Sequence, residues 1–397
     1  MNRKNKIWNW DYSKVNSYLL VAFLFSSSIT LPFKYFFGSG VPVYIYIFTI
    51  LLLSIYVNIH QMNKTFLIMS IIIIFILCID NLLVSFKEIS LYWSIEFIKF
   101  GLIPLYLACN KLNLDSFYKS WYQLGVINLF IWILFFNKVN NGEIDYMFFG
   151  ISLTYSFSIF LINLFYIPKN KMINVLFLVI SFTMILLLAN RIAIVICLIL
   201  FSIILINRSH KSYSGKVFLL TYFLFISIIV KKFLFILNHL KFLTDALGYN
   251  SYFINKAIYL MNFGFEAASS GRNLIYNEAY KLIKESNYMP NGIGYFQFKT
   301  NVVYPHNILL DITISFGIIG LIIFLTLFVI GLFSYKYNKN NDLKLVILVL
   351  STIVFIRLFF SGTYLTEIPL WIIIGLLINK KISYESNKEQ KNDKAIN

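Results

Sequence analysis

Residues 270–320 read SGRNLIYNEAYKLIKESNYMPNGIGYFQFKTNVVYPHNILLDITISFGIIG. Charged residues, turn residues and one histidine occur here beside long apolar runs, so we expect functional residues of the protein to lie in this stretch. Its first apolar residues at helical spacing are Ile275, Ala279, Leu282 and Ile283. They predict a short amphipathic helix that begins near Gly271, with Ser270 as its N-cap.

Arg272 lies in the first turn of this predicted helix, where the helix dipole disfavours a cation. A guanidinium beside free backbone N–H groups can nevertheless hold an anion, because both sets of donors converge on the same oxygens. Arg272 is therefore a candidate anion ligand. The alternative is an exposed arginine in a loop.

His306 is the histidine of the stretch. It follows Tyr304 and Pro305 and precedes a long apolar helix, so it is expected where a polar loop enters the bilayer. Asp311, about 140° around that helix from His306, is poorly placed to orient the imidazole, whereas Asn307 stays a candidate. The alternative is an ordinary interfacial histidine.

The chain is too apolar for a soluble protein, because 59% of its 397 residues are hydrophobic and 13% are charged. It is predicted to be an all-α polytopic membrane protein, in which apolar stretches of about 17 to 25 residues each cross ~30 Å of hydrocarbon. We expect about twelve transmembrane helices. Their approximate bounds are 17–33, 41–58, 66–86, 91–108, 117–136, 147–167, 172–189, 192–206, 217–237, 308–333, 343–360 and 364–379.

The spans divide the chain into four parts. Residues 1–237 hold spans one to nine, and residues 238–306 form one large extracytoplasmic loop that contains short helices. Residues 307–380 hold spans ten to twelve, and residues 381–397 are expected to form a disordered cytoplasmic tail.

Basic residues predict the orientation, because lysine and arginine are retained on the cytoplasmic side of short loops. They precede the first span and then fill alternate loops, so both termini are predicted to be cytoplasmic and the large loop to face outward. The first span has no small-residue cleavage site behind it and is expected to be a retained anchor. Membrane topology and anionic lipid headgroups account for the net charge of +17, so membrane lipids are expected partners and nucleic acid is not.

Ionisable groups inside spans cost about 2.5 to 3.5 kcal/mol at mid-membrane, so each is a functional candidate. Arg191 interrupts the apolar run 172–206, which would be ~50 Å long as one helix and must therefore fold back as two spans. Arg191 is then near the outer surface, where it could also simply snorkel to the headgroups. Arg357 and Glu367 lie across a short turn and are expected to pair.

Arginine is rare among the basic residues of this chain and occurs at a few particular positions. Only five of the 34 basic residues are arginines, and three are predicted at the outer face beside His306: Arg191, Arg272 and Arg357. Lysine would serve for topology, so this choice indicates bidentate recognition of an anion. Glu96 and Lys99, three residues apart on one helix face, are expected to form an internal pair.

Motifs for other chemistries are absent from the sequence. There is no Walker loop, H-E-x-x-H, cysteine pair or D-x-D, so neither a metal nor a cofactor is indicated. Glu143 and Asp145 are expected in a solvated loop. The three cysteines lie in or beside apolar spans at unrelated spacings and are assigned to packing.

The loop motifs follow one another in a characteristic order, namely Gly271-Arg272, P-x-G-x-G at 290–294, His306-Asn307 and G-x-x-G at 317–320. With these motifs and its many spans, the sequence resembles the O-antigen polymerase and O-antigen ligase superfamily. Asn190-Arg191 is similar to an earlier arginine of that family, which serine usually precedes. The specific resemblance covers about 50 residues plus Arg191.

This resemblance implies a metal-independent glycosyltransferase of the bacterial inner membrane with no cofactor and a site that faces the periplasm. Its substrates would be undecaprenyl-pyrophosphate-linked oligosaccharide and polysaccharide, and a chain-length regulator is an expected partner. Arg191 and Arg272 would hold the departing pyrophosphate, while His306 would take the proton of the acceptor hydroxyl. The expected substrate-binding residues are Arg357, Asn307, Gly292 and Gly294.

Three functions remain open. A polymerase transfers the growing glycan to the next lipid-linked repeat unit, and we prefer it because the chain keeps little beyond the shared motifs. A ligase uses the same donor and transfers the glycan to lipid A-core. A polysaccharide flippase or other transporter would also have many spans with few buried charges, but no second, matching half is found, and one large asymmetric loop favours the enzyme.

Overall fold

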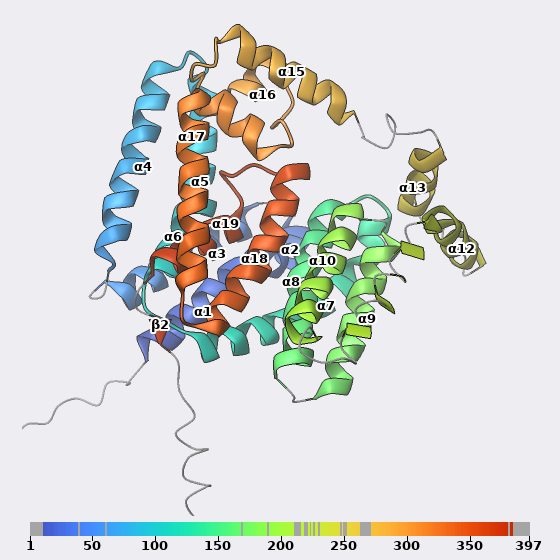
Figure 1. Ribbon diagram of the computed structural model, residues 1–397. Coiled ribbons are helices and arrows are strands. Elements are labelled where there is room, and N and C mark those ends of the chain that lie inside the picture. Colours follow the sequence, from blue (N-terminus) through green and yellow to red (C-terminus); the bar gives the residue numbers. More distant parts are fainter. Residues whose placement is uncertain are drawn as a thin grey trace, which may run out of the picture.

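The structure is a computed structural model built almost entirely of helices (Figure 1). It describes residues 11–38, 40–59, 62–167, 170–188, 190–209, 216–217, 221–222, 224, 227–228, 231–246, 248, 252–262, 271–379 and 382–383. Long apolar helices run through this part of the chain, so the predicted class of an all-α polytopic membrane protein is confirmed.

The first predicted span, 17–33, is not one straight helix. It forms α1 (Tyr12–Leu24) and α2 (Ser26–Phe37), which are bent by 58°. Hydroxyl groups of α2 form buried hydrogen bonds just after the bend: Thr30 donates to the carbonyl of Ser26 at 2.8 Å, and the hydroxyls of Ser28 and Ser152 lie 2.5 Å apart. Side chains of this kind compete with the backbone ladder of a helix.

The next predicted spans agree with helices to within a few residues. These helices are α3 (Val41–Asn58), α4 (Lys64–Leu83), α5 (Lys87–Phe97) continued by η1 (Ile98–Leu102) and α6 (Ile103–Cys109), α7 (Leu114–Asn140), α8 (Tyr146–Tyr166), α9 (Lys171–Leu187) and α10 (Arg191–Ser209). Several begin at an Asp or Asn N-cap, such as Asn63, Asn113 and Asp145.

Short helices occupy the segment predicted as the large loop. Those in the described residues are α12 (Phe233–Ala246), α13 (Tyr252–Asn262), α15 (Arg272–Glu285) and α16 (Tyr295–Thr300). The predicted helix near Gly271 is therefore confirmed as α15. Its N-cap position is Gly271, which has a φ of 76° and no side chain to cap with, while Ser270 lies outside the described residues.

The C-terminal part holds α17 (Ile308–Tyr337), α18 (Asn341–Phe360) and α19 (Ile368–Ile378). α17 was expected to be continuous but is broken at Gly317, where φ is 66° and ψ is −169°. At this break the N–H of Ile318 donates to the carbonyl of Tyr288 at 3.0 Å instead of to its own helix. A Cβ at position 317 would lie 2.6 Å from that carbonyl oxygen.

A two-stranded parallel pairing joins β1 (Leu112–Asn113) to β2 (Ile382–Ser383). Residues 382 and 383 of the predicted disordered tail, 381–397, are therefore ordered, and the other residues of the tail lie outside the described residues. Just before it, the Asn379 amide donates to the carbonyls of Ala108 and Asn110 at 2.8 and 2.5 Å. β2 lies at the opposite end of the bundle from α15 and α16 (Figure 1).

Among the described helices, eight are long and apolar enough to cross a membrane, or nine if the bent pair α1–α2 is one span. α9 and α19 are shorter apolar helices that match two further predicted spans. Eight of the 21 residues of the predicted span 217–237 lie outside the described residues, and α12 runs across residue 237. The number twelve and the boundary at 237 therefore stay predictions.

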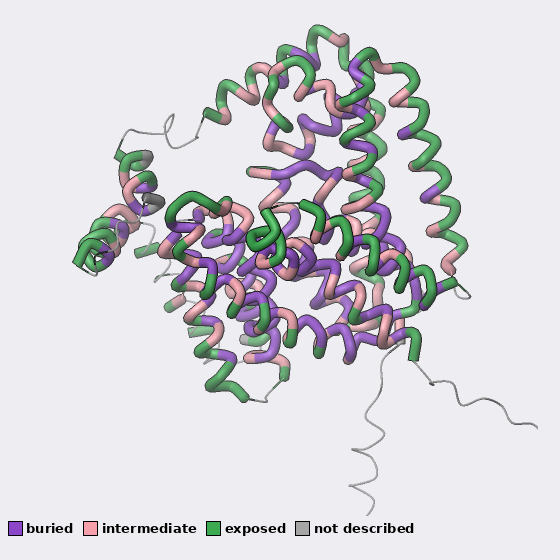
Figure 2. The backbone as a smooth tube through the Cα atoms, turned by 180° about the vertical axis from the view of Figure 1, so that it is seen from behind, coloured by how far each residue is buried: buried purple, intermediate pink, exposed green. Residues whose placement is uncertain are grey.

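Burial separates central helices from peripheral ones (Figure 2). α8 is 83% buried over its apolar window, whereas α4 and α17 are each 6% buried and present apolar side chains outward. Polar contacts tie α8 to α7: the Asn128 amide donates to the Ser156 hydroxyl at 2.8 Å, and the Trp132 indole donates to the Ser152 hydroxyl at 2.9 Å. Such bonds hold helices together where lipid supplies no hydrophobic driving force.

Candidate active site

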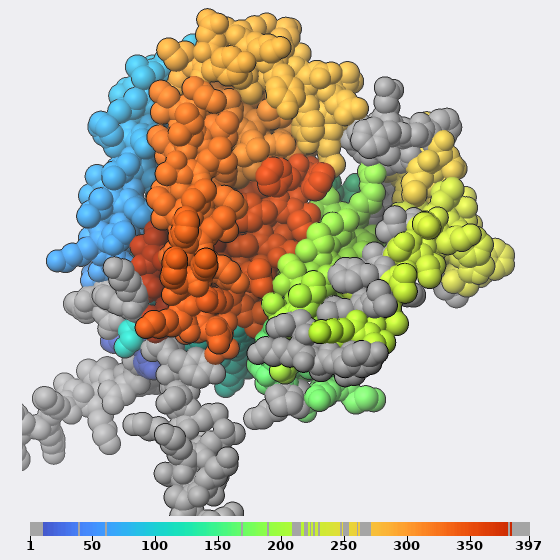
Figure 3. Space-filling view, in the orientation of Figure 1, coloured from blue at the N-terminus to red at the C-terminus, as the bar shows by residue number. Residues whose placement is uncertain are grey.

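Arg272 is positioned by α15, which covers one end of the bundle above α17 and α18 (Figure 3). The apolar face of α15 packs on the first turns of α17 in a small core made of Ala279, Leu282, Ile283, Phe296, Leu310 and Ile314. The Gly271 carbonyl accepts from the N–H groups of residues 274 and 275. The earlier N–H groups of this helix start are thus not used within the helix, which is the arrangement that favours an anion.

The turn at 290–294 fixes the loop between Arg272 and His306 to the bundle. The N–H groups of Asn291 and Gly292 donate to the carbonyls of Ile314 and Ser315 at 3.2 and 3.0 Å. The N–H of Ile293 donates to both carboxylate oxygens of Asp80 at 3.2 Å. α16 adds a further tie, because the Trp93 indole donates to the side-chain oxygen of Gln297 at 2.8 Å.

Gly292 and Gly294 have packing roles in this arrangement. Both have positive φ, of 94° and 85°. A Cβ on Gly292 would lie 2.4 Å from Val84, and one on Gly294 would lie 2.7 Å from Ile89. Their contacts are thus with the α4–α5 corner of the protein, and a role in substrate binding stays a prediction.

His306 stands directly before α17 with a φ of 56°, a strained value for a residue with a side chain. Its ring meets that of Tyr304 edge-on at 4.7 Å, and the Tyr276 hydroxyl donates to its carbonyl at 3.4 Å. The Nδ1 atom is buried without a hydrogen-bond partner. A strained backbone and an unsatisfied ring nitrogen both cost free energy, and such costs are typical of functional positions.

The two side chains considered as partners of the imidazole are engaged elsewhere. Asn307 caps α17 by accepting from the N–H groups of Leu309 and Leu310 at 2.9 and 3.4 Å. Asp311 accepts from the Thr363 hydroxyl at 2.8 Å, in agreement with the sequence argument against it. Binding of substrate by the Asn307 amide stays a prediction.

Arg191 is the first residue of α10. The Asn190 side chain fixes this helix start, because its oxygen accepts from the N–H of Ala193 at 3.1 Å and its amide donates to the Tyr146 carbonyl at 2.9 Å. Asparagine therefore supplies an N-cap where the resemblance leads one to expect serine. The contact also places the start of α10 beside the start of α8.

The pKa shifts of Arg272 and His306 indicate which of the predicted site residues lie near one another. Burial lowers the pKa of the Arg272 guanidinium, the phenol of Tyr276 raises it, and the positive charge of Arg191 lowers it. Burial lowers the pKa of His306 from its usual 6.5, and the positive charge of Arg272 lowers it further. Three groups that are far apart in the sequence thus lie within electrostatic reach in the order Arg191, Arg272, His306.

Arg357 lies at the edge of this cluster and forms the expected pair. Its Nη1 atom is 3.1 and 3.0 Å from the two carboxylate oxygens of Glu367, which is 2% exposed. Tyr304 lies within electrostatic reach of both Arg272 and Arg357, and the Arg272 guanidinium stands 5.8 Å from the Phe360 ring. The expected pair of Glu96 and Lys99 also forms.

The sequence did not single out the tyrosines of this site. Tyr146, Tyr276 and Tyr304 all lie close enough to Arg272 to raise its pKa. The chain has 27 tyrosines, so residue type alone gives no signal for these three. The adjacency of Tyr304 to Pro305 and His306 was the one local indication.

Residues 176–325 match the family model described as O-antigen ligase. The matched region contains Arg191, Arg272 and His306, and the members of this family are membrane glycosyltransferase-like enzymes. No curated protein and no solved structure matches the chain. The match supports the resemblance seen in the loop motifs, and residues 176–325 are similar to the O-antigen ligase family.

Proposed function

We propose that the protein polymerises a surface polysaccharide at the outer face of the bacterial inner membrane. The donor is a glycan on undecaprenyl pyrophosphate, and the acceptor is the next lipid-linked repeat unit. The site faces the periplasm, and membrane lipids and a chain-length regulator are partners in the same proposal.

The observation that carries this proposal is the convergence of Arg191, Arg272 and His306 from α10, α15 and the start of α17. Within the described residues, no carboxylate lies at ion-pair distance from Arg272. Its guanidinium is therefore available to an anionic ligand. Two arginines, each at the start of a helix, suit a pyrophosphate, because planar guanidinium groups bind pairs of phosphate oxygens.

The histidine suits the role of general base. Burial and the charge of Arg272 lower its pKa, so the imidazole is neutral at neutral pH and can accept a proton. The buried, unpartnered Nδ1 offers an acceptor for a substrate hydroxyl.

The reaction balances without a further reactant. The acceptor hydroxyl oxygen forms a bond to the anomeric carbon of the donor, and its proton passes to His306. The bond between that carbon and the pyrophosphate oxygen breaks, so undecaprenyl pyrophosphate leaves with the electron pair. Arg191 and Arg272 stabilise the negative charge that develops on this leaving group, as preorganised cations do in other transfer reactions. A reaction that uses arginines in this way is proposed to be metal-independent.

A ligase is the second candidate, because the matching family model carries that description. Both reactions use the same donor and the same base. They differ in the acceptor, which is lipid A-core for a ligase.

The surface polysaccharide of a deletion strain distinguishes the two. Loss of a polymerase leaves core that bears one repeat unit, whereas loss of a ligase leaves core that bears none. We expect single repeat units, and wild-type protein supplied on a plasmid should restore long chains. Bare core in the deletion strain would reject the polymerase in favour of a ligase or an export protein.

A further inference from the structure

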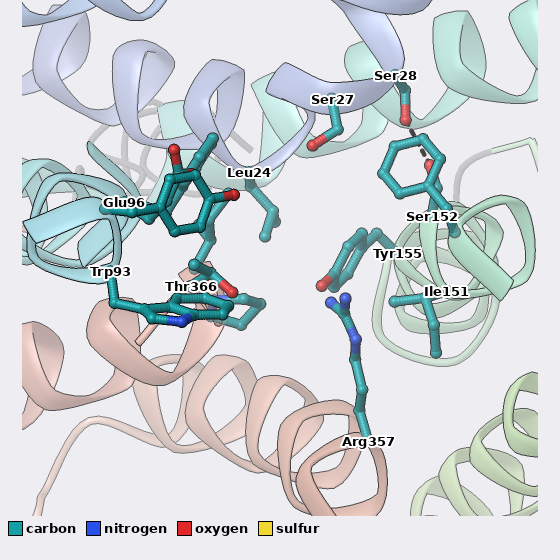
Figure 4. A pocket seen from close by; sticks show the side chains of 15 residues that line it. Leu24, Ser27, Ser28, Trp93, Glu96, Ile151, Ser152, Tyr155, Arg357 and Thr366 are labelled. Carbon is teal, nitrogen blue, oxygen red and sulfur yellow. Dashed lines mark hydrogen bonds between the residues drawn. The ribbon is translucent and has the colours of Figure 1, made fainter. Parts of the chain in front are cut away.

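A cavity of about 310 Å³ lies inside the bundle beside the arginine cluster (Figure 4). Its walls come from α1, α2, α5, η1, α8, α18, the segment before α19 and the first turn of α19. The polar and aromatic side chains of its lining include Ser27, Trp93, Glu96, Tyr155, Arg357 and Thr366. This volume is at the low end for ligand sites, which suits one small ring better than a long lipid chain.

The charges of the cavity are already neutralised. Arg357 points into it but is held by both oxygens of Glu367. Glu96 also lines it and is paired with Lys99. A pyrophosphate would find no unneutralised cation among these groups, in contrast to the site at Arg272. The ligand of this cavity is therefore expected to be uncharged.

The rest of the lining suits a polyhydroxylated ring. Ser27, Tyr155 and Thr366 present hydroxyl groups, and the Tyr155 hydroxyl faces the Arg357 guanidinium (Figure 4). Trp93 supplies an aromatic surface at the border of the cavity. Apolar and aromatic walls with a few convergent polar groups are the usual make-up of a small-ligand site.

Two residues, Trp93 and Tyr304, connect the surroundings of the cavity with the outer loop and the proposed active site. Trp93, one of its walls, is bonded to Gln297 of α16 in the outer loop. Tyr304 lies within electrostatic reach of both Arg357 and Arg272. A ligand in the cavity would thus lie on the Arg357 side of the arginine cluster.

We propose that this cavity is a subsite for one uncharged sugar ring of a lipid-linked substrate, separate from the anion site at Arg191 and Arg272. This inference rests on the proposed function. It assigns glycan recognition to α2, α5 and α8, which lie entirely outside the region matched by the family model.

The test measures two ligands separately on the full-length protein in lipid nanodiscs. One probe is the repeat-unit oligosaccharide released by mild acid from the lipid-linked pool of the host cell, which carries no pyrophosphate. The other is inorganic pyrophosphate. Ser27→Phe fills the cavity from α2, and Ser334→Phe is the matched control, because Ser334 is exposed on α17 outside the cavity.

We expect Ser27→Phe to weaken oligosaccharide binding by about tenfold or more while pyrophosphate binding is unchanged, since the ring would lose its space. Ser334→Phe should bind both probes normally. Thr366→Val, which keeps the shape and removes one hydroxyl, should weaken the oligosaccharide by roughly threefold to tenfold.

Oligosaccharide affinity unchanged in both Ser27→Phe and Thr366→Val would overturn the proposal, as would competition between the two probes for one site. A different measurement, of pyrophosphate binding, tests the proposed function. Normal pyrophosphate binding in Arg272→Ala would count against the anion site and leave the cavity result standing.

Discussion

Replacing Gly292 by alanine should release the loop that carries the active-site groups. The backbone at Gly292 has a φ of 94°, and an added Cβ would lie 2.4 Å from Val84 and 2.9 Å from an Asp80 oxygen. A left-handed conformation costs a residue with a Cβ about 1–2 kcal/mol, and overpacking costs about 1–3 kcal/mol more. The total is about 2–5 kcal/mol.

This cost is as large as the interactions that hold the segment. The N–H groups of Asn291, Gly292 and Ile293 donate to Ile314, Ser315 and Asp80. At about 1 kcal/mol for each bond, they contribute about 3 kcal/mol. The segment lies between Arg272 and His306, so its release should displace both, and a misplacement of about 1 Å can cost 10²-fold in rate.

The assay combines polysaccharide chain length on cells with trypsin cleavage at Lys299, which is exposed at the end of α16. Gly292→Ala should shorten the chains and speed cleavage. Gly142→Ala is the matched control, because Gly142 has a φ of 79° but no atom within 4 Å of an added Cβ. If Gly292→Ala kept long chains and slow cleavage, the reasoning about loop docking would be wrong.

Three further predictions follow from the site. Arg272→Lys keeps the charge but loses the bidentate fork, so gels of surface polysaccharide should show severely reduced polymerisation at normal protein level; long chains would contradict the anion role. His306 acts as a base in its neutral form, and its pKa lies below the usual 6.5, so kcat/KM should stay constant as the pH falls to 6.5 and decrease only at lower pH. A decrease of kcat/KM that begins above pH 6.5 would exclude His306 as the base. Alkaline phosphatase fused near Asn287 should be active and a fusion at the C-terminal tail inactive, and the reverse pattern would place the site on the cytoplasmic face.

Hydropathy alone predicted most of the helices, because a span needs about 20 apolar residues whatever it packs against. The bends were not predictable in this way. The α1–α2 bend has no proline or glycine at its centre, and just after it Ser28 contacts Ser152, more than a hundred residues away. The break at Gly317 depends on the Tyr288 carbonyl, which the turn at 286–289 brings into place.

The charged groups of the site were predicted from residue choice, since arginine is costly where lysine would serve. Their convergence rests on contacts that no local pattern records. Asp80 and Trp93, on α4 and α5, fix the outer loop from more than two hundred residues away. The glycines of the P-x-G-x-G motif suggested an open backbone for substrate, and the structure shows them packed against Val84 and Ile89.

The role of His306 as the general base can be tested by the chain length of the surface polysaccharide in cells with His306→Ala. His239→Ala is the control, because His239 lies on α12 and stacks on Phe235. General-base catalysis contributes about 10²- to 10⁴-fold, so His306→Ala at normal expression should leave single repeat units on the cell surface while His239→Ala keeps long chains. Full-length polysaccharide in the His306→Ala cells would contradict the general-base role.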